Sequence, residues 1–357
     1  MSATEMQSPP APPPPAPTLD PRTPPIDLLP LIGPDAPAAG ACMSIEQALA
    51  YCRGLASSHY ENFSVLTSLV PERLRDDFAA VYAFCRWADD LGDETGQSPD
   101  ARARSERLLA WWREGLNACF SDDAPADRSA GASAHPVFVA LRATRKRHPH
   151  LTARPFADLI DAFVQDQRVT RYQTWDQCVD YCTRSANPVG RIVLTLGGYA
   201  PPEADPANAD RYRMSDATCT ALQLINFWQD VRRDLLERDR VYLPADDTGI
   251  SVEKLRLWID RPNDPAARVP YIRALRPLVE RTAALFDIGR PLPSTLDKGL
   301  APVVWLFGAG GDAILNAVMR SGCTTLWDRP RLNAAQKGWL VARAFLWSRL
   351  AGGKTRE

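Results

Sequence analysis

This sequence has few histidines, almost no net charge and no cluster of cysteines. The 357 residues include 4 His, and 42 Lys and Arg nearly balance 43 Asp and Glu. Balanced charge gives no reason to expect a nucleic-acid partner, so any charge specificity must be local. The 8 cysteines stand singly or as Cys178-x3-Cys182. This spacing fits reduced thiols in a cytosolic protein better than a zinc ribbon or a disulfide scaffold.

Long hydrophobic runs are missing as well. The most apolar stretch, residues 299–319, is interrupted by Gly308, Gly310, Gly311 and Asp312, which argues against a transmembrane helix. The first residues lack the basic start and apolar core of a signal peptide, and the last six residues contain no hydrophobic anchor. We therefore expect a cytoplasmic protein that is soluble or peripherally associated with a membrane.

No segment alternates like a β-strand, and no G-x-G-x-x-G motif is present, so a Rossmann cofactor domain is excluded. Residues 1–40 are dominated by proline and alanine and are predicted to form a disordered tail. Ser44 followed by Gln47 fits a capped helix start. Apolar residues then recur every three or four positions in segments 74–92, 101–118, 136–147, 155–167, 174–199, 208–238, 268–288, 297–321 and 333–350. The sequence thus predicts an all-α, single-domain fold over residues 41–350.

The first notable motif is an acidic one, Asp89-Asp90-Leu91-Gly92-Asp93, which follows the apolar run 78–85. On a helix, Asp89 and Asp93 lie one turn apart on one face, with about 5 to 6 Å between their β-carbons. Like charges at this spacing repel unless a cation lies between them. Taken alone, such a motif is more typical of a solvated acidic turn.

A second acidic motif makes a cation site the favoured interpretation over a solvated acidic turn. Asn226, Asp230 and Asp234 recur every four residues, so they drift by only about 80° around a helix and form one polar stripe. The rest of this segment, including Leu224 and Phe227, is apolar, which predicts burial on most sides. Buried carboxylates need a metal or an arginine as a partner. Oxygen ligands without nearby His or Cys favour Mg²⁺, and two such faces across a cavity would clamp a diphosphate.

Several further motifs occur in a fixed order around these two. They are His59-Tyr60-Glu61-Asn62-Phe63, Leu69-Val70-Pro71, Tyr82-Ala83-Phe84-Cys85-Arg86, Tyr181-Cys182, Ser185-Ala186-Asn187-Pro188-Val189-Gly190-Arg191 and Arg240-Val241-Tyr242-Leu243-Pro244. Over residues 51–344 the sequence resembles the squalene/phytoene synthase family. The resemblance implies a terpenoid (isoprenoid) synthase helical bundle that acts on a prenyl diphosphate lipid.

The resemblance also assigns roles to individual residues. It implies catalytic roles for Asp89, Asp93, Tyr181 and Asp230; magnesium ligation by Asp89, Asp90, Asp93, Asn226, Asp230 and Asp234; and substrate contacts from His59, Asn62, Phe63, Arg86, Asn187, Gln223, Arg240 and Tyr242. By residue type alone, simpler roles remain open. Arg86 could hold the acidic pair in a salt bridge, Tyr181 could be an ordinary core residue, and Asn187 and Gln223 could be buried amides.

Within the family, the H-Y-E-N-F, S-A-N-P-V-G-R and N-F-W-Q-D-V patterns resemble the hydroxysqualene synthases of hopanoid biosynthesis. This implies Mg²⁺-dependent ionisation of presqualene diphosphate, water capture to hydroxysqualene and release of diphosphate. Such an enzyme is coupled in function to a presqualene diphosphate synthase and a hydroxysqualene reductase. NADPH is not expected, although the missing fingerprint does not by itself exclude it.

Three alternatives remain open at this stage. The first is head-to-head condensation of farnesyl diphosphate to presqualene diphosphate or squalene, the second a class I terpene cyclase, and the third a helical scaffold without catalysis. The amphipathic segment 332–350 carries Trp339, Leu340, Phe345 and Trp347 among basic residues. Core packing is the favoured role for it, and peripheral membrane contact is the alternative.

Overall fold

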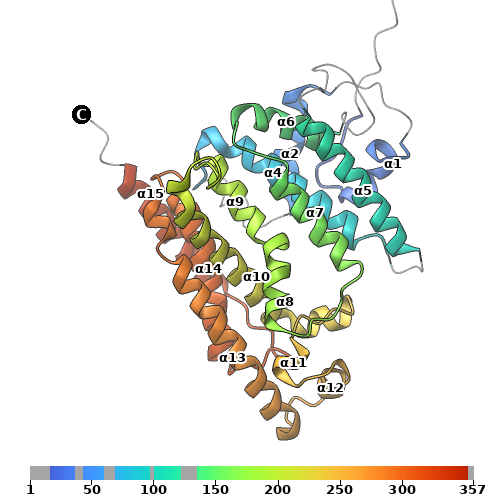
Figure 1. Cartoon of the computed structure of the whole chain (residues 1–357), viewed down its shortest axis with the longest axis vertical. Helices are drawn as coiled ribbons and strands as arrows, with labels where there is room; N and C mark the ends of the chain where they lie inside the picture. The colour runs from blue at the N-terminus through green and yellow to red at the C-terminus, as the bar shows by residue number, and fades with distance from the viewer. Residues whose placement is uncertain (1–16, 37–42, 60–68, 97–99, 122–134, 353–357) are drawn as a thin grey trace, which may run out of the picture.

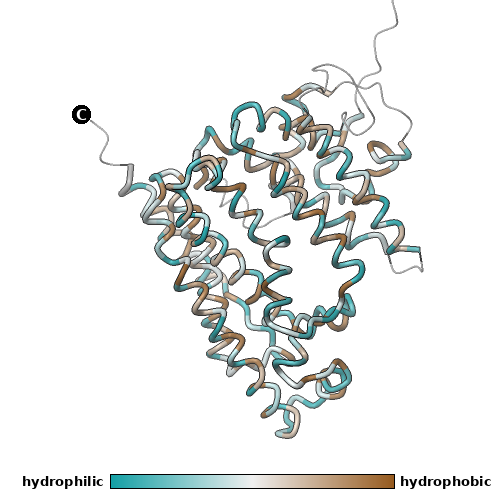
Figure 2. The backbone as a smooth tube through the Cα atoms, in the orientation of Figure 1, coloured by the Kyte–Doolittle hydropathy of each residue, from teal (hydrophilic) through white to brown (hydrophobic). Residues whose placement is uncertain are grey.

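The computed structural model describes residues 17–36, 43–59, 69–96, 100–121 and 135–352. In these residues the regular structure is helical, apart from one isolated β-bridge between Arg171 and Val241. The all-α prediction is therefore confirmed. Hydrophobic residues recur along each helix rather than along extended segments (Figure 2).

One group of helices lies towards the N-terminus (Figure 1). It comprises α2 (Ile45–His59), α4 (Glu72–Asp93), α5 (Ala101–Phe120), α6 (Pro136–Arg147) and α7 (Arg154–Asp166). Their shared core is rich in aromatic rings, with Phe84 packed against Trp112 and Phe156. This rigid packing holds α4, which carries the first acidic motif.

A second group surrounds the long helix α10 (Figure 1). It comprises α8 (Trp175–Ser185), α9 (Asn187–Leu196), α10 (Ala209–Glu237), α11 (Ala245–Thr248), α12 (Val252–Trp258), α13 (Pro265–Gly289), α14 (Ala301–Arg320) and α15 (Ala334–Gly352), with 3-10 turns η3 (Pro206–Asn208) and η4 (Leu292–Thr295). Helix α10 packs against α8, α9, α13 and α14. A β-carbon at Gly311 would lie 2.4 Å from Leu222 Cδ2, so this glycine permits the close approach of α14 to α10.

The prediction of a disordered tail through residue 40 is wrong for residues 17–36. Pro25–Leu28 forms a 3-10 turn, η1, and Leu29–Ile32 forms the short helix α1. The Leu28 side chain is only 4% exposed and belongs to the core of the first helix group. A short leucine and isoleucine cluster between the prolines supplies this buried surface, which an average over the proline-rich composition conceals. Residues 1–16 and 37–42 lie outside the described part of the chain.

Two helix boundaries show how local signals act. The capped start at Ser44 is confirmed, because Gln47 N–H donates to Ser44 Oγ at 3.1 Å and Ser44 N–H donates to Gln47 Oε1 at 2.9 Å. The single helix predicted over residues 174–199 is wrong. It breaks at Ala186, where φ is −126° and ψ is −50°, because Pro188 has no N–H to continue the helical ladder. The break makes Asn187 the first residue of α9.

Candidate functional site

The first acidic motif occupies the last turn of α4. The Asp90 side chain is 1% exposed, whereas Asp89 is half-exposed. Arg86 Nη2 lies 2.6 Å from Asp90 Oδ1, but the geometry makes no hydrogen bond, so both Asp90 oxygens are buried without a hydrogen-bond partner. Burial raises the pKa of Asp90 to about 7. The salt-bridge role of Arg86 is thus observed, and its role towards diphosphate stays a prediction.

Asp93 links this motif to the second one. Its carboxylate forms ion pairs with Arg238 and, at 2.9 Å, with Arg240. Arg238 is the residue that ends α10, so the C-terminal ends of α4 and α10 meet at Asp93. The positive charge of Arg238 opposes the rise in pKa that burial causes in both Asp89 and Asp234. Arg238 therefore lies close to both acidic motifs, and the two motifs share one region of the molecule.

The second motif lies on α10 as its spacing predicted. Leu224, Ile225, Phe227 and Trp228 are buried, whereas Asn226 is exposed and Asp230 and Asp234 are half-buried. Burial, together with the charge of Asp230, raises the pKa of Asp234 to about 6. Asp230 is paired with Arg329, whose Nη2 lies 3.0 Å from Asp230 Oδ2, and more loosely with Arg233 at 3.4 Å.

Arginines thus pair with four of the carboxylates that were predicted to hold magnesium, namely Asp89, Asp90, Asp93 and Asp230. Within the described ranges, no group of three or more His, Cys, Asp or Glu side chains is arranged to hold a metal ion. The donor chemistry nevertheless fits Mg²⁺, because the two motifs offer only oxygen ligands and Asp90 carries two buried oxygens without hydrogen bonds. The six predicted ligands are therefore suited to the ion in chemistry, and the four paired carboxylates would have to exchange their arginine partners to bind it.

Aromatic side chains form a cluster beside the acidic motifs. Phe227 and Tyr242 stack with ring centroids 3.8 Å apart, and the Tyr181 ring lies 6.0 Å from each of them. The Tyr181 hydroxyl donates a 2.7 Å hydrogen bond to Asp166 Oδ2. Ring faces can stabilise a nearby positive charge. The structure brings Tyr181 and Tyr242 together and buries both as core residues, and their roles towards substrate stay predictions.

Asp166 is a component that the sequence analysis missed. This residue ends α7, and its Oδ1 atom is buried without a hydrogen-bond partner. Arg240 Nη1 lies 3.9 Å from Asp166 Oδ2 while Arg240 Nη2 contacts Asp93, so Arg240 joins the aromatic cluster to the first acidic motif. Burial raises the pKa of Asp166 to about 7. The only signal in the sequence was a single acid at the end of an amphipathic helix, which is a common surface feature.

Five predicted substrate contacts gain no support from the described residues. Asn187 Oδ1 accepts a 2.9 Å hydrogen bond from Thr220, which fits a buried amide that joins α9 to α10. Gln223 is half-buried on α10. His59 is the last residue of α2, and Asn62 and Phe63 lie outside the described residues. The roles of these residues towards substrate stay predictions.

A cavity of about 700 Å³ lies between α10, α14 and α15. Its apolar walls include Leu306, Ile314 and Leu340, and its polar lining includes Asn226 and Arg329. Arg331 and Lys337 also line it. Sequence patterns did not single out these three basic residues: Arg329 and Arg331 lie between α14 and α15, and Lys337 lies on α15. A cavity lined by apolar side chains and three basic ones suits a ligand with an anionic head and a hydrocarbon tail.

An α-helical bundle with two neighbouring acidic helix faces, an aromatic cluster and a lipid-sized cavity defines the class of isoprenoid synthases. A profile of the squalene/phytoene synthase family matches residues 45–336. The chain belongs to this family, whose members act on prenyl diphosphates, and the resemblance seen in the sequence is confirmed.

Individual relatives support the same family. The chain is 32% identical over 259 residues to the hydroxysqualene synthase of Rhodopseudomonas palustris, covering 71% of this chain and 78% of that protein. It is 31% identical over 297 residues to the phytoene synthase of Thermus thermophilus, covering 82% and 90% of the two chains. The crystal structure of squalene synthase HpnC from Alicyclobacillus acidocaldarius matches with a TM-score of 0.65 and 39% identity, covering 78% of this chain and 95% of that one.

Proposed function

We propose that this protein is a hydroxysqualene synthase that ionises presqualene diphosphate in a Mg²⁺-dependent reaction. The observation that carries the diphosphate chemistry is the meeting of both acidic helices at Arg238, which caps the end of α10 and forms an ion pair with Asp93 at the end of α4. The choice of branch is supported by the similarity to the R. palustris hydroxysqualene synthase and by the H-Y-E-N-F and S-A-N-P-V-G-R motifs.

In this proposal the two helix faces hold the head of the substrate. Asp89, Asp90 and Asp93 on α4 and Asn226, Asp230 and Asp234 on α10 would ligate magnesium, which neutralises charge on the leaving diphosphate. Arg86, Arg240 and Tyr242 would contact the diphosphate, and Arg238 and Arg329 are added to this set. A guanidinium freed from its carboxylate can bind phosphate oxygens with two parallel hydrogen bonds.

The aromatic cluster would act on the carbon skeleton. When the C–O bond to diphosphate breaks, the bonding electrons leave with the diphosphate and a carbocation remains. The ring faces of Tyr181, Phe227 and Tyr242 lie together and would stabilise that charge. Water then forms the new C–O bond and loses one proton, so each turnover consumes one water and releases hydroxysqualene, diphosphate and a proton. No reductant is needed for this balance.

We further propose a cytoplasmic location and a place between two other enzymes. A presqualene diphosphate synthase must supply the substrate, and a reductase must act on hydroxysqualene if squalene is the end product. The alternative, head-to-head condensation of farnesyl diphosphate, is favoured by one observation, namely the 31% identity to a phytoene synthase along 82% of this chain.

Product identification tests the proposal. Purified protein is incubated with presqualene diphosphate or with farnesyl diphosphate, each with Mg²⁺ or with EDTA, and each with and without NADPH. Mass spectrometry should find hydroxysqualene from presqualene diphosphate with Mg²⁺ alone. Presqualene diphosphate left unchanged while farnesyl diphosphate is consumed would establish the condensation instead.

A further inference from the structure

Helix α14 is more apolar than its burial explains. It is the one helix in the described ranges that is long and apolar enough to cross a membrane, with a mean hydropathy of 1.3, yet only 28% of that window is buried. Met319 on this helix is exposed, and the exposed Phe307 lines the 700 Å³ cavity. A core helix of the same composition would be mostly buried. Part of the apolar surface of α14 therefore remains open to another partner.

Helix α15 packs along α14 at the outer edge of the bundle (Figure 1). Trp339 is 59% exposed and Leu346 is 61% exposed, and their spacing of seven residues places both on one face. Core packing, the role favoured by the sequence, holds for Leu340 and in part for Phe345 and Trp347. It does not hold for Trp339, which lies on the outer face.

The charged residues of α15 all have one sign, and the one acid on α14, Asp312, is paired with Arg290. Helix α15 contains Lys337, Arg343 and Arg349 and no Asp or Glu. Arg320, at the end of α14, is also exposed. The Arg343 guanidinium packs over the Trp339 ring at 5.2 Å and over the Trp305 ring at 5.1 Å. The net charge of the whole chain is −1, so this basic, aromatic face is a local feature.

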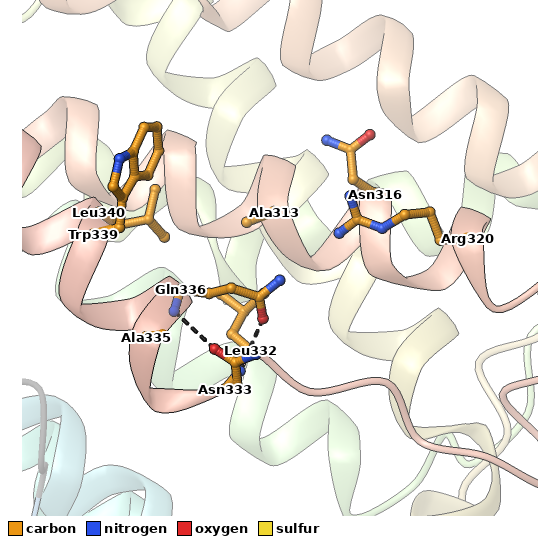
Figure 3. Close-up of a pocket in the computed structure, with 9 residues that line it drawn as sticks. All are labelled: Ala313, Asn316, Arg320, Leu332, Asn333, Ala335, Gln336, Trp339 and Leu340. Carbon is orange, nitrogen blue, oxygen red and sulfur yellow. Dashed lines mark hydrogen bonds between the residues drawn. The ribbon is translucent and has the colours of Figure 1, made fainter.

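An apolar groove of about 460 Å³ runs between the two helices (Figure 3). Trp339, Leu340 and Leu332 line one side, and Ala313, Asn316 and Arg320 of α14 line the other. Leu332 and Leu340 also line the 700 Å³ cavity described above. The outer groove and the inner cavity are thus separated by shared side chains.

We propose that the face formed by α14 and α15 docks on an anionic lipid bilayer. Tryptophan prefers the boundary between headgroups and acyl chains, and a basic helix without acids, as α15 is, is attracted to anionic headgroups. The docked face places the bilayer next to Leu332 and Leu340. For the proposed function, this gives a hydrocarbon substrate or product a short route between membrane and cavity. The docking itself does not depend on which reaction the site performs.

Vesicle flotation with the full chain tests this. We expect binding to vesicles of equal parts phosphatidylcholine and phosphatidylglycerol, and little binding to phosphatidylcholine alone. The double variant Trp339→Ala/Leu346→Gln should reduce the bound fraction at least fivefold, and Arg320→Gln/Arg349→Gln should make binding to the two vesicle types alike. Two variants on other helices are matched controls that should bind normally. They are Leu257→Gln on α12, where the leucine is also exposed, and Arg104→Gln on α5.

Three results would overturn the proposal. The first is wild-type binding to anionic vesicles that the variants leave unchanged, and the second is no binding at all. The third is a dimer in analytical ultracentrifugation that the Trp339→Ala/Leu346→Gln variant dissociates, because a second copy of the chain would then cover the face. Turnover of a detergent-dispersed substrate tests the proposed function separately, because neither Trp339 nor Leu346 lines the inner cavity. Loss of vesicle binding with normal turnover of that substrate is the signature expected of the variant.

Discussion

The two acidic motifs share a helical spacing but lie in different surroundings. On α4, Asp93 is paired with Arg238 and with Arg240, whose side chain is only 10% exposed. On α10, Asp230 is almost as buried as Asp93, but its partners Arg329 and Arg233 are 33% and 44% exposed. The pair of Asp93 with Arg240 is therefore part of the structural framework, whereas Asp230 can exchange partners at a lower energetic cost.

The largest expected effect comes from removing one carboxylate charge in each motif. The two variants should differ in stability but lose similar amounts of activity. Asp93→Asn leaves Arg240 as a buried cation with a weaker partner, so the free energy of unfolding should fall by about 3 kcal/mol. Asp230→Asn breaks partly exposed pairs and should cost about 1 kcal/mol or less. Turnover should fall roughly 100-fold in both variants if both act on the diphosphate. Thermal denaturation and product assays check this, and equal loss of stability in the two variants would contradict the comparison.

The pH dependence of the metal-free protein should reveal the buried acid beside the first motif. The pKa of Asp166 is raised from 3.8 to about 7 by burial, so its folded state binds the proton more tightly than the unfolded chain. Its contribution to stability is full below pH 3.8 and is lost as the pH rises to about 7. Each unit of pKa difference corresponds to about 1.4 kcal/mol.

Asp166→Asn is the matched variant for this effect. It cannot ionise, so its free energy of unfolding should decline less than that of the wild type over the same pH range. Chemical denaturation at several pH values measures the difference. Identical pH profiles for the two proteins would show that Asp166 does not titrate in this range.

Removing the Tyr181 hydroxyl tests the link between the aromatic cluster and Asp166. In Tyr181→Phe, the Asp166 carboxyl loses its 2.7 Å hydrogen bond, and stability should fall by about 1–3 kcal/mol. The ring face remains, so turnover should decline less than in Tyr181→Leu. If Phe and Leu reduce turnover equally, the ring does not stabilise the reacting carbons.

The smallest expected effect concerns the ion pair between Arg329 and Asp230 of α10. Arg329→Gln removes the partner that competes with a metal ion for Asp230, so the affinity for Mg²⁺ without diphosphate should rise roughly fivefold, about 1 kcal/mol. Isothermal titration calorimetry measures it, and Arg331→Gln, which also lines the cavity, is the control. Weaker Mg²⁺ binding by Arg329→Gln would show that Arg329 supports the site instead.

Most helices could be predicted because their information is local. The periodic segments on α4, α10 and α13 needed no knowledge of neighbours, and the Ser44 cap was visible in four residues. Two predictions failed where a short signal was outweighed by its surroundings. The proline-rich composition concealed Leu28 and Leu29, and the apolar periodicity across residues 174–199 concealed the helix break before Pro188.

The candidate site was only partly visible for the same reason. Asp89, Asp93, Asp230 and Asp234 repeat at helical spacing, so a pattern search finds them. Asp166, Arg238 and Arg329 have no such spacing, since their role depends on which distant residue each one meets.

By itself, the sequence determined the helical class, the two acidic faces and the family, because each follows from the order of neighbouring residues along one helix. Only the tertiary structure decided that Arg238 and Arg240 meet Asp93, that Asp166 receives the Tyr181 hydroxyl, and that the outer face of α15 stays open. These features depend on helices far apart in the chain packing together. Burial there sets which charges need partners, and no local pattern encodes that.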